Sequence, residues 1–340
     1  LTFQARIAVG GDGTIFATWM AVEDVGTLSV IGPTRIVASR STDGGATFSP
    51  PAAISDSGRE RVGAAEPVID SEGDLVVVYV DFKDDRRDFE NLEGPAWDQP
   101  LALVITRSSD GGESFSAGRE LEAGLILGRR FLVYLPELPS VAAGPEGALY
   151  VAWTDGRSGD EDVLLRRSGD GGRTWDDAVR VHDEAVGDGT TQHLPAVDVD
   201  EAGRVSVAFL DRRRDPDDVM SDAHLAASSD GGRSFTDIRL TDEAFDTRVG
   251  PVTAQFLGVD LGSRIGLSTM PGSAITVWTD TRLGTEDTGR QDIAAATVAF
   301  TERETRQAWA LPLATVAILG LALITVLALR ARGSSTVDRS

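Results

Sequence analysis

The chain has 340 residues, no cysteine, and a formal net charge of −22, with 54 acidic against 32 basic side chains. This charge argues against nucleic acid as a partner, because neutralising phosphates needs a basic patch, and the lack of cysteine excludes disulfides and thiolate metal sites. The 37 glycines and the short apolar runs favour an all-β array over several small domains.

Five similar segments follow one another along the chain. Each has a first strand that ends at an acidic, glycine-containing turn, then an apolar second strand, a loop and a third strand. The loop 81–100 of the second segment is long and charged, and such loops often carry function. The expected first, second and third strands are 5–9, 14–20 and 35–40; 67–70, 74–80 and 101–107; 140–143, 148–153 and 162–167; 196–200, 205–210 and 224–227; and 255–261, 273–278 and 292–300.

One motif, Ser-x-Asp-Gly-Gly-x-Ser/Thr-aromatic, follows the third strand of the first four segments at intervals of 60 to 67 residues. Glycine reaches positive φ without steric cost, the aspartate can accept hydrogen bonds from turn N–H groups, and the aromatic ring is available for burial. The motif therefore predicts four hairpin turns, each pinned to its sheet by a ring. They contain Ser41, Asp43, Gly45 and Phe48; Ser108, Asp110, Gly112 and Phe115; Ser168, Asp170, Gly172 and Trp175; and Ser228, Asp230, Gly232 and Phe235.

This motif and its spacing resemble the Asp-box, or BNR repeat, of sialidase-like β-propellers, and the resemblance covers about residues 4–300. It implies that each segment is one blade and that the Asp-box is a structural turn on the face away from the ligand site. Propellers of this family have six blades, and five are visible. The fifth lacks an Asp-box and a fourth strand, and only Leu1–Gln4 precede the first strand. We therefore expect upstream residues that supply a signal peptide, a closing strand and a sixth blade.

An Asp-x-Arg pair recurs in the loops that follow the second strands. In an antiparallel blade these loops lie on the face opposite the Asp-boxes, which is the expected ligand face. Two interpretations stay open: the arginines bind a carboxylated sugar through bidentate contacts, or each pair braces one blade against the next, which the repetition favours. The pairs are Asp155 and Arg157, Asp211 and Arg213, and Asp280 and Arg282, with Asp81 and Lys83 as a weaker copy.

The resemblance also implies a sialidase catalytic set: three arginines for the sugar carboxylate, an aspartate acid/base, and a late tyrosine nucleophile with a glutamate partner. Arg6 is a faint match to the first arginine, and Asp24 stands roughly where the acid/base belongs. Tyr134, with Glu137 nearby, is the one tyrosine expected on the ligand face. The match to the set is incomplete, because no tyrosine follows Tyr150.

The remaining polar residues have simpler explanations. Tyr79 and Tyr150 fall within apolar second strands, so core packing is expected, and the three histidines are too dispersed for a metal triad, although His193 is placed to touch a ligand. No cofactor or metal is expected. Two carboxylate clusters are of the type that holds calcium, but their spacing favours solvated acidic loops. They are Asp84, Asp85 and Asp88, and Asp215, Asp217 and Asp218.

The segment 309–329 has 21 residues without a charge, the length of a transmembrane helix, and the tail that follows is basic. By the positive-inside rule, the tail is cytoplasmic and the propeller extracellular. We expect a single-pass membrane protein, of a bacterium by its lack of cysteine, with an ectodomain at 1–300, a linker at 301–308, a helix at 309–329 in the lipid bilayer and a tail at 330–340.

These observations favour a cell-surface propeller that engages glycans, glycoproteins or another extracellular ligand without a complete sialidase catalytic set. One alternative is an exo-α-sialidase or related exo-glycosidase that acts on acidic sugars. Another is a structural or protein-binding surface propeller. A late tyrosine with a glutamate partner would favour the enzyme, and none is present.

Overall fold

The computed structural model describes residues 2–22, 33–84, 100–126, 139–250, 265–285 and 287–301. These residues form β-strands and one short 3-10 turn, Pro145–Gly147, which confirms the all-β class. No helix among them is long and apolar enough to cross a membrane. The expected transmembrane segment 309–329, the linker after residue 301 and the tail lie outside the described residues.

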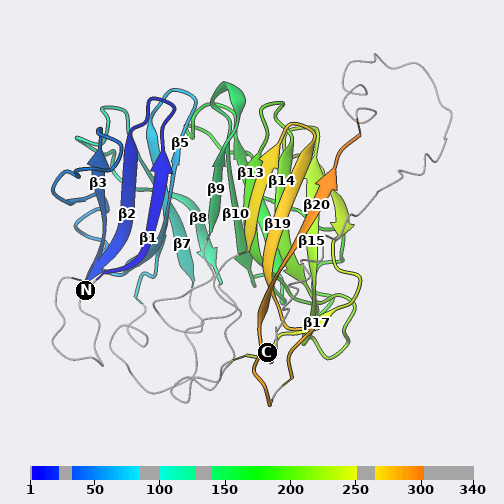
Figure 1. Cartoon of the computed structure of the whole chain (residues 1–340). Helices are drawn as coiled ribbons and strands as arrows, with labels where there is room; N and C mark the ends of the chain where they lie inside the picture. The colour runs from blue at the N-terminus through cyan, green and yellow to red at the C-terminus, as the bar shows by residue number, and fades with distance from the viewer. Residues whose placement is uncertain are drawn as a thin grey trace, which may run out of the picture.

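The strands form five antiparallel sheets, which we call blades one to five in chain order (Figure 1). Within each blade the strands lie side by side in the order of the sequence. The blades are β1 Thr2–Val9, β2 Ile15–Val22, β3 Thr34–Ser41 and β4 Ala52–Ala53; β5 Val62–Ile69, β6 Leu75–Asp81, β7 Leu101–Ser108 and β8 Arg119–Leu125; β9 Ser140–Ala143, β10 Leu149–Asp155, β11 Asp162–Ser168 and β12 Val179–Arg180; β13 Gln192–Val199, β14 Val205–Asp211, β15 Met220–Ser228 and β16 Thr236–Arg239, with β17 Phe245–Asp246 beside β15; and β18 Gly266–Met270, β19 Ser273–Asp280 and β20 Asp292–Ala299.

Three expected strand positions need correction. The first strand of blade five is β18, Gly266–Met270, which pairs with β19, whereas the sequence predicted 255–261, a range outside the described residues. The first strands β5 and β13 begin four to five residues earlier than predicted. Each contains a β-bulge, which interrupts the alternation of side chains, so only the part after the bulge has a regular strand pattern.

The first strand of each blade contacts the first strand of the next, from β1 through β5, β9 and β13 to β18. Between these blades lie four apolar clusters, one at each boundary. An aromatic residue at the same position of the second strand packs into the cluster shared with the preceding blade, and its exposed fraction is at most 4%. These residues are Tyr79, Trp153, Phe209 and Trp278.

Candidate functional site

The four Asp-box turns share one pattern of hydrogen bonds. In the first, the Ser41 hydroxyl donates to Asp43 Oδ1 at 2.8 Å and accepts from the N–H of Gly45 at 2.9 Å. The N–H and hydroxyl of Thr47 donate to the two oxygens of Asp43 at 2.9 and 2.6 Å. These bonds hold the pKa of Asp43 at about 2. The same bonds recur at Ser108 and Asp110, Ser168 and Asp170, and Ser228 and Asp230.

The Asp-box rings of blades two to four pack against the preceding blade. Phe115, Trp175 and Phe235 are partly buried in the clusters shared with blades one, two and three. Phe48 differs from the expected buried ring, because 45% of its surface is exposed. Among the described residues, no blade precedes blade one, so the Phe48 ring has no sheet to pack against. The box serines and aspartates thus hold turns together, as the motif predicts.

The Asp-x-Arg pair of blade three contacts blade two. Arg157 Nε donates to Asp155 at 2.9 and 3.0 Å, and its Nη2 donates to Glu122 on β8 at 2.7 Å. Its Nη1 donates to the carbonyl of Ala123 at 3.1 Å. Burial alone would lower the pKa of Arg157, but the bonds to the two carboxylates raise it above its usual value. These are the contacts that a brace between blades requires.

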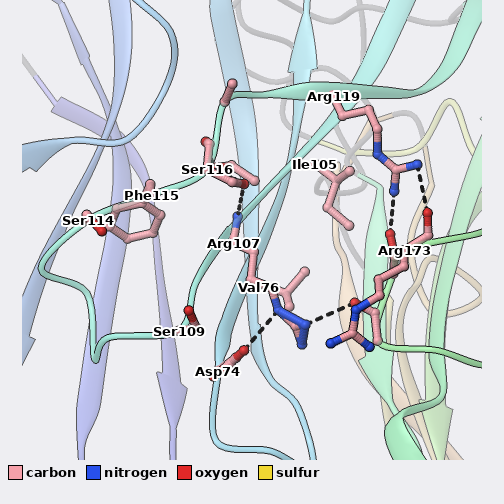
Figure 2. A pocket seen from close by; sticks show the side chains of 14 residues that line it. Asp74, Val76, Ile105, Arg107, Ser109, Ser114, Phe115, Ser116, Arg119 and Arg173 are labelled. Carbon is pink, nitrogen blue, oxygen red and sulfur yellow. Dashed lines mark hydrogen bonds and ion pairs between the residues drawn. The ribbon is translucent and has the colours of Figure 1, made fainter.

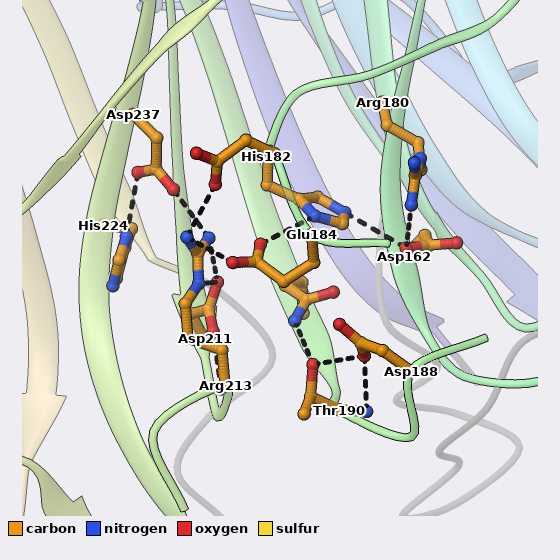
Figure 3. A network of polar contacts seen from close by, with 12 residues as sticks. Asp162, Arg180, His182, Glu184, Asp188, Thr190, Asp211, Arg213, His224 and Asp237 are labelled. Atoms are coloured by element: carbon orange, nitrogen blue, oxygen red, sulfur yellow. Dashed lines mark hydrogen bonds and ion pairs between the residues drawn. The ribbon is translucent and has the colours of Figure 1, made fainter. Parts of the chain in front are cut away.

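Arg213 of blade four lies in a larger network at the boundary with blade three (Figure 3). Its Nη2 lies 2.6 Å from both Asp211 and Asp237, and its Nη1 lies 2.9 Å from Asp183 and 2.5 Å from Glu184. Asp211, Asp237 and a buried histidine have the spacing of a possible metal site. The guanidinium of Arg213 already occupies the position between these carboxylates that a cation would take.

Two histidines belong to the same network. His182, whose side chain is fully buried, lies 3.2 Å from Asp162 and 3.1 Å from Glu184. His224 Nδ1 lies 2.8 Å from Asp237 (Figure 3). Burial would raise the pKa of Asp237, but the hydrogen bond with His224 and the charge of Arg213 hold it below its usual value. The network therefore keeps an ionised carboxylate inside the boundary.

The other copies also form ion pairs. Arg282 contacts Asp280 at 2.6 Å and reaches Asp242, which follows the last long strand of blade four. In the weaker copy, Lys83 lies 3.5 Å from Asp81 and contacts a glutamate on β8 of its own blade. The cation from the preceding connection is Arg59, which contacts Asp81. All three Asp-x-Arg guanidiniums are thus engaged by carboxylates of an adjacent blade or connection.

A different arrangement lies along the first strands. β1, β5 and β13 each contain a bulge at the same position, with a left-handed residue that is not glycine: Gln4 at φ 57°, Ala64 at φ 56° and Leu194 at φ 54°. The amide oxygen of Gln4 accepts a hydrogen bond from the N–H of Ala64 at 2.7 Å, which joins two of the bulges. Left-handed backbone costs about 1–3 kcal/mol at such residues and is common beside functional sites.

The residues that follow the first two bulges form an ion pair. Arg6 Nε donates to Glu66 Oε1 at 3.2 Å, and the side chains are 26% and 10% exposed. The Arg6 Nη1 also donates to the carbonyl of Ala5 at 2.8 Å. Sequence reasoning selected Arg6 but missed Glu66, because neither alanine nor glutamine signals a bulge. The signal that could have indicated the bulges is a short irregular stretch that recurs before the regular part of these first strands.

The remaining candidate site residues are either buried in the structure or lie outside the described residues. Tyr79 is fully buried, and burial raises its pKa, while Tyr150 is 3% exposed, so both belong to the core as expected. His193 is buried on β13, opposite Leu210. The weak catalytic candidates Asp24, Tyr134 and Glu137 lie outside the described residues.

The two suspected calcium loops fall partly within the described residues. Asp215 accepts hydrogen bonds from the N–H groups of Val219 and Met220 at 2.8 and 2.7 Å. Asp218 accepts from the N–H and hydroxyl of Thr191 at 3.0 and 2.8 Å. Its carboxylate thus joins the loop to the preceding connection. Asp84 and Asp217 are exposed, and Asp85 and Asp88 lie outside the described residues.

No protein-family model and no curated protein matches the chain. Solved structures match its fold. A protein of unknown function from Dyadobacter fermentans is 18% identical with a TM-score of 0.54, over 98% of this chain and 84% of that one. The α-L-arabinanase of Penicillium chrysogenum, complexed with arabinobiose, is 15% identical with a TM-score of 0.51, over 88% of each chain. A leech intramolecular trans-sialidase is 12% identical with a TM-score of 0.54, over 91% of this chain and 59% of that one.

The fold is that of the β-propeller glycosidases. At these identities the likeness concerns the fold alone. It agrees with the propeller that the sequence predicted from its repeats.

Proposed function

We propose that the protein is a carbohydrate-binding propeller, and that the ligand contacts Arg6 and Glu66 on the first strands of blades one and two. The observation that carries the proposal is their ion pair at 3.2 Å, beside two bulges that repeat at equivalent positions. A guanidinium held at one edge by a carboxylate keeps a fixed direction, so it can donate to sugar hydroxyls or a sugar carboxylate without first losing much rotamer entropy.

A sugar is the favoured ligand class for two reasons. The solved arabinanase with this fold is complexed with arabinobiose. The chain also has an acidic composition that does not favour polyanions such as nucleic acid. The Asp-x-Arg arginines are a less favourable binding set, because Arg157, Arg213 and Arg282 are each engaged by two or more carboxylates.

Binding without sialidase chemistry is proposed because the described tyrosines cannot supply the nucleophile. Tyr79 is fully buried, with a raised pKa, and Tyr150 is packed between blades three and four. A tyrosine nucleophile must reach the sugar and lose its proton to a nearby carboxylate. Hydrolysis is therefore the outcome that would contradict this proposal.

The test measures binding by the full chain to arabino-oligosaccharides, sialyl-lactose and oligouronides by isothermal titration calorimetry. We expect Arg6→Met and Glu66→Gln to weaken binding by about tenfold or more, since each removes a charged hydrogen bond of about 1.5–3 kcal/mol. Ile7→Ser is the matched control, because Ile7 is the next residue on β1 and is 67% exposed. The double variant removes both charges of the pair, and its melting transition separates lost binding from lost folding.

Binding that survives in Arg6→Met, with an unchanged melting transition, would overturn the proposed site. Binding lost equally in Ile7→Ser would do the same. Release of nitrophenol from an aryl sialoside or arabinoside, abolished by Glu66→Gln, would replace the binding proposal by the glycosidase alternative.

We also propose that the propeller is displayed outside the cell and anchored by residues 309–329. The support is the uncharged 21-residue segment and the basic residues that follow it. Fractionation of cells that express the full chain tests this. The protein should stay with membranes after a carbonate wash and be accessible to added protease, and release into the soluble fraction would contradict the anchor.

A further inference from the structure

A cavity of about 730 Å³ lies between blades two and three, on the side of the Asp-box turns (Figure 2). Its walls come from β6, β7, the start of β8 and the box turns of both blades. This is the face opposite the Asp-x-Arg loops, so the cavity is separate from the ligand site proposed above. Three arginines line it: Arg107, Arg119 and Arg173.

The three arginines are held in different ways. Arg107 forms ion pairs with Asp70 and with Asp74, the latter at 3.1 Å. Arg119 donates to the carbonyl oxygens of Gly172 and Arg173, the latter at 3.1 Å. Arg173 donates to the carbonyl of its own box aspartate at 2.9 Å. Carbonyl oxygens orient a guanidinium but do not cancel its charge.

Arg119 and Arg173 are therefore held by carbonyl oxygens, and the charge of Arg173 also acts on the Asp74 carboxylate. Among the described residues, Arg119 and Arg173 form no ion pair, whereas Arg107 uses both nearby aspartates. Burial and the positive charge of Arg173 lower the pKa of Arg107. The same wall also carries acidic groups, because Asp74 lines the cavity and has a carboxylate oxygen within 4.8 Å of those of Asp70 and Glu72.

The neighbouring boundaries do not repeat the full set of three arginines. The register puts Arg119 opposite Ile105, and the equivalent residue is Ala52 in blade one and Val179 in blade three. The Asp-box position of Arg173 is Glu113 in blade two and Arg233 in blade four, so Arg119 is the arginine that the other boundaries lack. At the boundary of blades three and four, the arginine equivalent to Arg107 is paired with an exposed aspartate at 3.3 Å. The structure of the repeat alone therefore does not require three arginines.

The rest of the lining suits a sugar that carries an anion. Ser109, Ser114 and Ser116 line the cavity (Figure 2), but the Ser114 hydroxyl donates to Asp110 and the Phe115 ring packs into the cluster shared with blade one, so Ser109 and Ser116 are the hydroxyls considered for a ligand. A pocket of this volume holds far more than one inorganic oxyanion, since ligand pockets for whole small molecules are roughly 300–1,000 Å³. Serine hydroxyls both donate and accept hydrogen bonds, so they can bond to sugar hydroxyls.

We propose that this cavity is a second binding site, which takes a sugar bearing a sulfate or carboxylate group, with the anion between Arg119 and Arg173. The guanidinium planes supply paired N–H donors that match an oxyanion, and the hydroxyls of Ser109 and Ser116 contact the sugar. The site does not depend on the ligand proposed for the opposite face. It gives the propeller one ligand surface on each side.

The experiment titrates the full chain with three probes: a sulfated disaccharide, its unsulfated parent and inorganic sulfate. Binding is followed by calorimetry and by the fluorescence of Trp175, which lies in the same box turn as Arg173. We expect the sulfated disaccharide to bind with strong salt dependence, and Arg119→Gln and Arg173→Gln each to weaken it at least tenfold. Arg233→Gln is the matched control, because it changes the same box position in the next blade.

Four results would overturn the proposal. The first is no saturable binding of any anionic probe. The second is equal weakening by Arg233→Gln. The third is equal affinity for the sulfated disaccharide and its unsulfated parent. Inorganic sulfate that binds as tightly as the sulfated sugar would also contradict it, because the sugar contacts would then contribute nothing. Weaker binding of inorganic sulfate at the same arginines, lost in both variants, would support it.

Discussion

The middle blades and the terminal blades of this propeller have the same order of strands, but the side chains of those strands are buried to different extents. The second strands β6, β10 and β14 of blades two to four are buried at every position. In blades one and five, β2 and β19 alternate between buried and half-buried positions. Apolar residues on the open faces are strongly exposed, with Ile7 at 67% and Ile293 at 75%.

This difference shows that burial in a propeller comes from the neighbouring blade and not from the strand itself. The residue equivalent to Tyr79 and Trp153 is Trp19 in blade one, and it is only partly buried. Ile7 and Phe48 of the same blade are also exposed. The open faces of blades one and five are those that an additional blade would cover, which agrees with the sixth blade expected from the sequence, and that expectation stays a prediction.

The largest expected effect compares two tryptophans at the same position. Trp153→Ala should lower the free energy of unfolding by about 3–5 kcal/mol, because it leaves a cavity between two packed blades. Trp19→Ala should cost about 1 kcal/mol, since one side of that ring has no neighbouring sheet. Urea denaturation of both variants, followed by circular dichroism, measures the difference.

Equal losses in the two variants would break the comparison. They would mean that Trp19 is covered in solution as fully as Trp153. A Trp153→Phe variant serves as the control, because it keeps an aromatic ring and should lose much less stability.

The second effect compares two braces. Arg213, with a side chain 19% exposed, joins several carboxylates between blades three and four. Arg282, 29% exposed, has as its partner across the boundary Asp242, whose side chain is 90% exposed. Arg213→Met should cost about 2–3 kcal/mol, below the cost of breaking a fully buried pair. Arg282→Met should cost about 1 kcal/mol or less, because its outer partner is solvated.

Differential scanning calorimetry on both arginine variants measures this pair. Arg214→Met is a suitable control, since Arg214 neighbours Arg213 but is 55% exposed. If Arg213→Met keeps full stability and instead loses binding of an acidic sugar, the Asp-x-Arg pairs form a ligand site and the brace interpretation is wrong.

Features that depend on a few adjacent residues were predictable from the sequence. The Asp170 turn follows from two glycines, a serine and an aspartate, all within one loop. Features that depend on the neighbouring blade could not be predicted in this way. The exposure of Phe48 and the direction of the Arg213 side chain are decided by segments that lie far away in the sequence. The bulge at Ala64 was also missed, because alanine has no preference for positive φ and only the partner strand imposes it.

The smallest effect concerns the Asp-boxes, where terminal and middle blades should behave alike. The hydrogen bonds of Asp43 in blade one and Asp170 in blade three are the same, and both have lowered pKa values. A carboxylate with a lowered pKa stabilises the fold above its ordinary pKa of 3.8, and that contribution is lost as the pH falls toward about 2. The melting temperature should therefore drop over this window.

Melting curves between pH 7 and pH 2 for Asp43→Asn and Asp170→Asn test the point. Each variant should melt lower than the wild type at pH 7 and lose less stability on acidification, because one of the four titrating carboxylates is gone. Glu201→Gln removes an exposed carboxylate outside any box and serves as the control. An acid profile that changes for Asp170→Asn but not for Asp43→Asn would show that the turns, like the second strands, depend on the blade beside them.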